Sequence, residues 1–323
     1  MGGTLILRLP RVFINVPNGA ADGAEYRVSR RPGQAGAKFA EGGSSHAGRS
    51  ARPMTDVTPG PEEGSDSKIN TDVPQSARIW NYWLGGTDNY EIDRIAGDQY
   101  VALYPGIVDI ARAGRYFMDR AIRFLALDRG IRQFMDCGTG LPTVDNTHEM
   151  AQRAAPDAKV VYVDNDPLVL AHARALLTGT PEGRTSYIDC DLHDPKTIMG
   201  RAAEILDLSR PVGLLLIGVM GHVVDPGEAY GVVRGLMEPL ASGSYLILHD
   251  STDQNEAFNA AQRAYDETGA IPFRLRSPEF IRGYFDGLEM VEPGLVTSGA
   301  WRPEVGSMDI EDLPTLCAVA RKP

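Results

Sequence analysis

The chain has 323 residues, of which 43% are hydrophobic, so it can bury a sizeable core in one large or two small domains. Its net charge of −11 argues against nucleic acid as a partner, because a phosphate backbone requires a basic face on the protein. No apolar run approaches the roughly 20 residues of a membrane span, and we expect neither a signal peptide nor a membrane partner. Three scattered cysteines suit a reduced, cytoplasmic protein.

The N-terminal residues 1–67 differ in composition from the rest of the chain. Gly, Ser, Pro, Arg and acidic residues dominate from Gly19 to Ser67 and offer little apolar area to offset the entropy of ordering. We expect a disordered extension here, either a regulatory tail or an over-long start of the reading frame. Residues 68–130 are expected to form a helical cap, because their apolar spacing predicts helices over 77–84, 88–104 and 107–129.

From residue 131 onward, predicted strands and helices alternate. The strands are expected at 131–136, 159–164, 185–189, 212–218 and 244–249. The helices are expected at 142–154, 167–177, 195–206, 226–240 and 253–268. The nearly continuous apolar strands indicate burial on both faces, hence a doubly wound, mostly parallel α/β sheet. After Gly269 we expect a helix at 277–285, a loop at 301–313, and strands at 288–296 and 315–320.

Two of these strands end in carboxylates beside a glycine turn. The first ends at Asp136 and runs into Gly138-Thr-Gly140, and the second ends at Asp164. This layout is typical of a nucleoside-binding crevice, in which the second acid accepts ribose hydroxyls. The third glycine of a dinucleotide motif is replaced by Thr143, and Asp136 would repel a pyrophosphate. S-adenosylmethionine, which carries an ammonium and a sulfonium but no phosphate, therefore fits better than NAD. An NAD-dependent oxidoreductase is the alternative.

The segments FMDCGTG and VDNDPLVL resemble the first two motifs of class I S-adenosylmethionine-dependent methyltransferases. The chain from about residue 76 to its end resembles, more narrowly, the actinobacterial S-adenosyl methyltransferase family long labelled as a domain of unknown function. That resemblance is carried by SARIWNYWLGGTDNYEIDR, ARAGRYFMDRAIRFL, DCGTGLPTVDNTHEMAQ, VVYVDNDPLVLAHARALL and FDGLEMVEPGLV. It implies a Rossmann-like sheet with an antiparallel last strand, a helical N-terminal cap and S-adenosylmethionine as cofactor. The resemblance does not identify the methyl acceptor, which we expect to be an oxygen or nitrogen nucleophile of a small molecule. A homodimer is left open.

The resemblance also implies cofactor roles for particular residues. Asp136 and the backbone of the glycine turn should face the methionine end, and Asp164 should bind the ribose. Asn165 should lie beside the adenine, whose amino group Asp191 should approach. For Asp164 and Asp191 the alternative is a helix cap, a role that Asp166 and Asp194 fill better. The turn and its neighbourhood complete the expected site: Cys137, Gly138, Thr139, Gly140, Cys190, Leu192 and Gly218.

The methionine carboxylate requires a cation, and Arg115 is our candidate. An arginine upstream of the glycine turn resembles the arrangement in the leucine-carboxyl methyltransferase group, and a guanidinium suits bidentate binding of a carboxylate. The alternative is a solvated helix arginine, with the rivals Arg112, Arg120 and Arg123.

The acceptor should lie beside the loop that follows the fourth strand. His222 in this loop could deprotonate an acceptor, or could simply bond to a neighbouring backbone group. The pair His249-Asp250 ends the fifth strand, but consecutive strand residues face opposite sides, so we assign no site there.

Beside the break at residues 85–86, Tyr82, Asp88 and Asn89 could form a lid that closes over the pocket. We expect no metal. A sensor or regulatory module that binds the cofactor without turnover is the non-enzymatic alternative.

Overall fold

A computed structural model describes residues 70–143, 145–176, 180, 182–303 and 313–323 of the chain. The predicted extension over residues 1–67 lies outside the described residues, as does most of the loop expected at 301–313.

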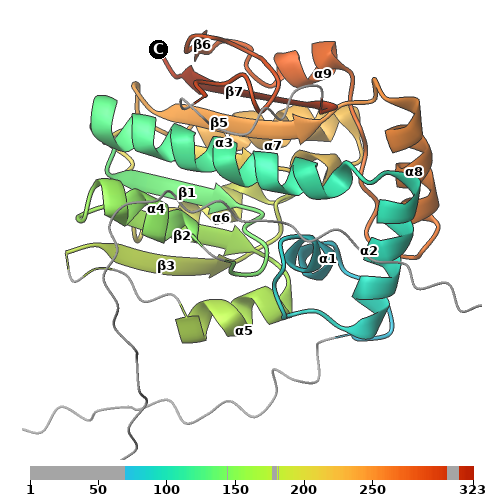
Figure 1. Cartoon of the computed structure of the whole chain (residues 1–323). Coiled ribbons are helices and arrows are strands. Elements are labelled where there is room, and N and C mark those ends of the chain that lie inside the picture. The colour runs from blue at the N-terminus through green and yellow to red at the C-terminus, as the bar shows by residue number, and fades with distance from the viewer. Residues whose placement is uncertain (1–69, 144, 177–179, 181, 304–312) are drawn as a thin grey trace, which may run out of the picture. The chain divides into compact units, whose positions relative to one another are not determined.

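The described residues form a seven-stranded sheet in the order β3-β2-β1-β4-β5-β7-β6 (Figure 1). Strands β1 to β5 pair in parallel, whereas β7 pairs antiparallel with both β5 and β6. The predicted doubly wound fold with an antiparallel last strand is therefore confirmed. The strands are β1 Gln133–Cys137, β2 Lys159–Asp164, β3 Arg184–Asp189, β4 Gly213–Ile217, β5 Tyr245–Ser251, β6 Glu289–Met290 and β7 Thr315–Arg321.

Helices cover both faces of the sheet. The helices are α1 Ser76–Trp83, α2 Glu91–Leu103, α3 Ile107–Asp128, α4 Thr147–Ala154, α5 Pro167–Leu176, α6 Pro195–Ala202, α7 Pro226–Met237, α8 Glu256–Asp266 and α9 Pro278–Gly283, with a short 3₁₀ helix η2 Met220–His222. In Figure 1, α3 and α4 pass in front of the sheet, and α6 and α7 lie behind it. Each layer shares a separate apolar core with the sheet, because the strand residues are buried on both faces.

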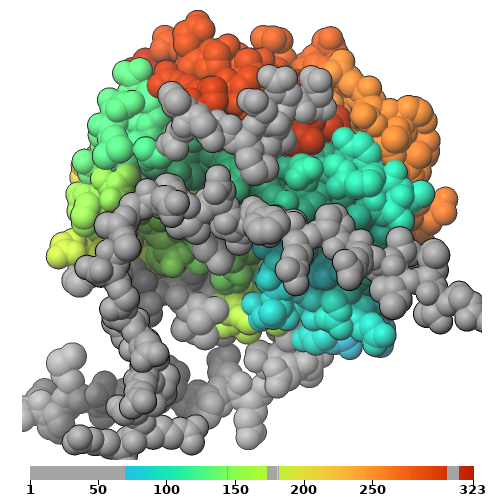
Figure 2. Space-filling view, viewed as in Figure 1, coloured from blue at the N-terminus to red at the C-terminus, as the bar shows by residue number. Residues whose placement is uncertain are grey.

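The first two helices pack at one end of the sheet against α8, far along the chain. Trp83, Tyr100, Phe258 and Tyr265 share one apolar cluster in which the aromatic rings meet edge to face. Figure 2 shows the blue and teal atoms of these early helices next to the orange atoms of the C-terminal third. Among the described helices, none combines the length and the apolar character needed to cross a membrane.

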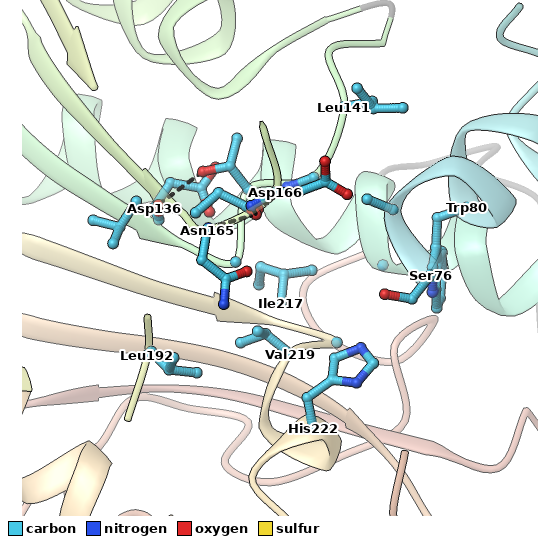
Figure 3. Close-up of a pocket in the computed structure, with 18 of the residues that line it drawn as sticks. Ser76, Trp80, Asp136, Leu141, Asn165, Asp166, Leu192, Ile217, Val219 and His222 are labelled. Atoms are coloured by element: carbon cyan, nitrogen blue, oxygen red, sulfur yellow. Dashed lines mark hydrogen bonds between the residues drawn. The ribbon is translucent and has the colours of Figure 1, made fainter. Parts of the chain in front are cut away.

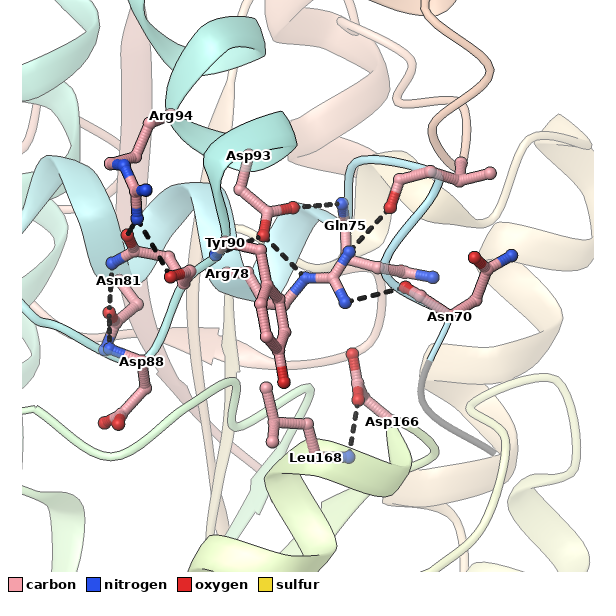
Figure 4. A network of polar contacts seen from close by, with 12 residues as sticks. Asn70, Gln75, Arg78, Asn81, Asp88, Tyr90, Asp93, Arg94, Asp166 and Leu168 are labelled. Atoms are coloured by element: carbon pink, nitrogen blue, oxygen red, sulfur yellow. Dashed lines mark hydrogen bonds and ion pairs between the residues drawn. The ribbon is translucent and has the colours of Figure 1, made fainter. Parts of the chain in front are cut away.

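A buried ion pair anchors α1 to α2 (Figure 4). Nε of Arg78 lies 2.9 Å from Oδ2 of Asp93, with both side chains almost fully buried. Asp93 also accepts hydrogen bonds from the backbone N–H groups of Gln75 and Tyr90. The same guanidinium donates to the carbonyl of Val73 just before α1. These contacts hold the start of α1 in a fixed position relative to α2.

Two sequence predictions of local structure were wrong. The helix expected from residue 142 begins only at Thr147, because Asn146 supplies its N-cap and forms a reciprocal capping box with Glu149. The strand expected at 288–296 shrinks to the two residues of β6. Pro293 has no N–H to donate to the sheet, and Gly294 turns the chain at a φ of 87°. Beyond β6, Val291 donates a hydrogen bond to Val319 of β7, and Val296 forms an isolated bridge with Cys317.

Candidate cofactor and acceptor cavity

A cavity of about 270 Å³ opens at the carboxyl ends of the parallel strands, between the glycine turn after β1 and helix α1 (Figure 3). This is the place where doubly wound folds bind ligands. Most of the predicted site residues line it: Arg115, Asp136, Gly138, Thr139, Gly140, Asp164, Asn165, Cys190, Asp191, Leu192, Gly218 and His222.

The backbone conformation favours glycine at both positions of the turn, and close packing also requires it at the first. Gly138 and Gly140 have φ values of 73° and 66°, a region that side chains disfavour. A β-carbon on Gly138 would lie 2.2 Å from Cγ2 of Val219, which leaves no room for a side chain. A β-carbon on Gly140 would meet no atom within 4 Å. The turn therefore packs closely against the β4 loop at its first glycine and leaves open space at its second.

Asp136 places a buried carboxylate at the end of β1. It is 4% exposed and accepts a hydrogen bond from Oγ1 of Thr147 at 2.5 Å. Burial raises the pKa of Asp136 to about 6, although the bond from Thr147 and the charge of Arg115 oppose the rise. The carboxylate is thus mostly ionised at neutral pH and is suited to a cationic ligand group.

Asp164 at the end of β2 is tied to three backbone N–H groups. It accepts from Gly140 at 2.8 Å, from Asn165 at 2.9 Å and from Asp166 at 3.0 Å. Burial raises the pKa of Asp164, and these bonds oppose the rise. A carboxylate has about four acceptor positions, so one more donor can still bind. The helix-cap role belongs to Asp166, which accepts from the Leu168 N–H at 2.8 Å.

Asn165, Asp191 and His193 form a short polar chain at one edge of the cavity. Nδ2 of Asn165 donates to Asp191 at 2.9 Å, and the ring and backbone nitrogens of His193 contact the other carboxylate oxygen at 2.6 and 2.9 Å. Asp194, as expected, caps α6 by accepting from Thr197. Sequence reasoning missed His193, although it lies only two residues after Asp191.

Arg115 is the only one of the four candidate arginines among the lining residues. It donates to the backbone carbonyl of Asp145. Burial lowers the pKa of Arg115, and the neighbouring Asp136 counteracts that shift. Among the rivals, Arg120 donates to the carbonyls of Ser298 and Trp301. The other two rivals pair with aspartates on their own helix: Arg112 with Asp109 and Arg123 with Asp119.

His222 lies in η2 and lines the cavity, where Figure 3 shows its ring near Val219. Its Nδ1 lies 3.0 Å from the carbonyl oxygen of Pro272. Because a carbonyl can only accept, this contact assigns the hydrogen to Nδ1 and leaves Nε2 as an acceptor. Burial lowers the pKa of His222, so the ring is neutral at pH 7.

His249 also lines the cavity, and we assigned it no role from sequence. It is 1% exposed, and neither ring nitrogen has a hydrogen-bond partner in the described structure. Burial lowers its pKa to about 4. The next residue, Asp250, does not line the cavity. Alternation along β5 therefore brings one member of the pair to the cavity, as the strand period requires.

Four predicted residues do not line the cavity. The Tyr82 hydroxyl donates to Asp98 at 2.8 Å, and Nδ2 of Asn89 donates to Asn81 at 3.0 Å. Asp88 lies 3.7 Å from the ring of His172. Cys137 is completely buried in the core, and burial raises its pKa well above that of an ordinary thiol. The structure thus gives the first three side chains polar partners within the protein and packs Cys137 in the apolar core.

The face of α1 that lines the cavity was not identified from the sequence. Ala77, Trp80, Asn81 and Leu84 recur at helical spacing and all line it, whereas Tyr82 points to another side. The spacing could have revealed this face, but not that it borders a cavity instead of a core. No cluster that could hold a metal is found among the described residues.

The strand order, the antiparallel β7 and a cavity at the strand ends define a class I methyltransferase type of fold. The chain belongs to the S-adenosyl methyltransferase family, whose model matches residues 62–323. The predicted family membership is confirmed, and S-adenosylmethionine is the cofactor of this chemistry.

Two solved structures are similar over most of the chain. A DUF574 family protein from Streptomyces avermitilis is 43% identical, with a TM-score of 0.75, over 78% of this chain and 99% of its own. A putative methyltransferase from Thermobifida fusca is 37% identical, with a TM-score of 0.72, over 82% and 99% respectively. No functionally curated protein matched the sequence.

Proposed function

We propose that the protein transfers the methyl group of S-adenosylmethionine to an oxygen or nitrogen nucleophile of a small molecule bound in the same cavity. The observation that carries this proposal is the convergence of Asp136, Asp164 and Arg115 on one cavity beside a glycine turn. The two carboxylates suit the ammonium and the hydrogen-bond-donating ribose diol of the cofactor, and the guanidinium suits its carboxylate.

Each of these groups has a proposed task. Asp136 binds the ammonium, which its buried, mostly ionised carboxylate attracts. Arg115 binds the methionine carboxylate, and the remaining acceptor position of Asp164 takes a ribose hydroxyl. The Asn165–Asp191 pair borders the adenine. When bound, S-adenosylmethionine supplies an electrophilic methyl group, and the protein's part is to orient the acceptor and accept its proton.

The alternatives are a nicotinamide-dependent oxidoreductase and a sensor that binds the cofactor without turnover. A pyrophosphate would lie near the ionised Asp136 and be repelled, which disfavours the first. A sensor without turnover would not need a proton acceptor, yet Nε2 of His222 remains an acceptor at the cavity wall.

Calorimetric titration of the full chain with S-adenosylmethionine, S-adenosylhomocysteine and NAD tests the proposal. We expect micromolar binding of the first two and no binding of NAD. NAD binding alone would overturn the proposal. Formation of S-adenosylhomocysteine in the presence of a cell extract separates an enzyme from a sensor, and light scattering of the same sample tests the homodimer.

A further inference from the structure

The charged side chains that line the cavity all gather in one part of it. They lie on α3, in the last residues of β1 and β2, or just after β2 and β3: Arg115, Asp136, Asp164, Asp166 and Asp191. We call the wall that they form, with the glycine turn, the cofactor half. A second part of the wall is contributed by α1, β4, η2, β5 and residue 271.

This second wall, the acceptor half, contains no charged side chain among the described residues at neutral pH. Its apolar members are Trp80, Leu84, Ile217, Val219, Val223 and Ile271. Its ionisable members are His222 and His249, and burial keeps both rings neutral at pH 7. Figure 3 shows Trp80, Ile217 and His222 pointing into the cavity from three separate elements. A charged ligand bound here would lose hydration without gaining an opposite charge.

His249 is the unusual member of the acceptor half. A buried imidazole ordinarily bonds through at least one nitrogen, yet both of its nitrogens lack a partner in the described structure. Gly114 of α3 leaves room for the ring, since a β-carbon there would lie 3.3 Å from Cε1 of His249. Phe117 stacks on the ring at a centroid distance of 6.3 Å. The ring is thus held in place by packing alone, with its hydrogen-bonding capacity unused.

His222 offers the complementary group. Its Nδ1 hydrogen is bound by the Pro272 carbonyl, so Nε2 can take a proton. A neutral imidazole removes a proton from a phenol-type hydroxyl, with a pKa near 10, far more readily than from an alkyl alcohol. An alkylamine would arrive as a cation at neutral pH, and the acceptor half offers it no carboxylate.

We propose, building on the methyltransferase function above, that the acceptor is an uncharged, largely apolar molecule with a phenol-type hydroxyl, which His249 positions by a hydrogen bond and His222 deprotonates. The oxygen bonds to the methyl carbon as the carbon–sulfur bond breaks, and the bonding pair stays on sulfur. The hydroxyl proton passes to Nε2 of His222 and then to water. The products are a methyl ether and S-adenosylhomocysteine.

Three probes that share one ring system test the class of acceptor: 2-naphthol, 2-naphthoate and the cationic 2-naphthylmethylamine. Each is titrated into the full chain saturated with S-adenosylhomocysteine. We expect 2-naphthol to bind at least tenfold more tightly than either charged probe. Equal or tighter binding of a charged probe, or no binding of 2-naphthol, would overturn the proposal. Failure of S-adenosylhomocysteine itself to bind would instead count against the proposed function.

Variants at His249 test the positioning role. His249→Phe should weaken 2-naphthol binding about three- to tenfold, the value of one neutral hydrogen bond, and leave S-adenosylhomocysteine binding unchanged. His249→Gln, which keeps a donor and an acceptor, should restore part of the loss. His172→Phe makes the same change outside the cavity lining and serves as the control. Undiminished 2-naphthol binding by His249→Phe would refute the hydrogen bond.

The proton transfer has a separate readout. His222→Gln should lower kcat for 2-naphthyl methyl ether formation at least 100-fold while the Kd for 2-naphthol stays within threefold. An unchanged kcat would remove His222 from the mechanism.

Discussion

The two halves of the cavity differ in how their polar groups are held. In the cofactor half, the chain itself binds the carboxylates: Asp136 accepts from Thr147, and Asp164 accepts from three backbone N–H groups. In the acceptor half, His249 has no such partner in the described structure, and His222 uses one nitrogen. The first half is therefore preorganised for a ligand of defined charge, whereas the second keeps hydrogen-bonding capacity for the molecule that enters.

Loss of the α1 anchor should disturb the acceptor half most, because α1 contributes Trp80 and Leu84 to that wall. Arg78→Met leaves Asp93 buried and unpaired, which should lower the free energy of unfolding by about 3–5 kcal/mol. Denaturant unfolding measures this loss. The control Arg112→Met breaks a half-exposed pair and should cost less than about 1 kcal/mol. Similar losses for both variants would mean that the buried pair is not an anchor.

Removal of the Asp164 carboxylate, which is proposed to bind the ribose, should affect the cofactor half alone. Asp164→Ala takes away the acceptor of three N–H groups and of the expected ribose bond, so S-adenosylhomocysteine affinity should fall about 100-fold. Calorimetry measures the change, and Asp164→Asn should lose less because it keeps one acceptor oxygen. An unchanged dissociation constant for the alanine variant would contradict the assignment of Asp164 to the ribose.

A lower pH should weaken the binding of S-adenosylmethionine in the same half, by a smaller factor. With a pKa of about 6, Asp136 is about one-tenth ionised at pH 5 and mostly ionised at pH 7. Because an ammonium binds the ionised form, S-adenosylmethionine affinity should rise about tenfold between these values. Titrations at pH 5, 6 and 7 measure the rise. Asp136→Asn should bind more weakly at pH 7 and show a flatter profile; a profile as steep as that of the parent protein would point to another group.

A truncation at the mouth of the acceptor half should have the smallest effect. Ile271 lines the cavity but is 48% exposed. Ile271→Ala should leave the Kd for S-adenosylhomocysteine within twofold and weaken 2-naphthol no more than about threefold, because little buried area is lost. A larger loss of S-adenosylhomocysteine binding would show that the two halves are not separate in function.

The sequence by itself determined the features that depend on neighbouring residues in the chain. Apolar runs, glycines and capping acids specified the alternating elements, the turn at Gly138 and Gly140, and the acids Asp136 and Asp164 at strand ends. It also separated the capping acid Asp166 from Asp164, because Asp166 directly precedes Pro167, which takes the favoured first position of α5. These are short-range effects, so the local pattern contains the information.

Only the tertiary structure decided which side chains meet across distant elements. It selected Arg115 among four helical arginines and turned a face of α1 toward the cavity. It also gave Tyr82, Asp88 and Asn89 partners within the protein, and none of these three residues lines the cavity. It also placed His249 beside Gly114, more than 130 residues earlier in the chain. Periodicity says which residues share a face, but what that face meets depends on how the layers pack, and no local pattern encodes that packing.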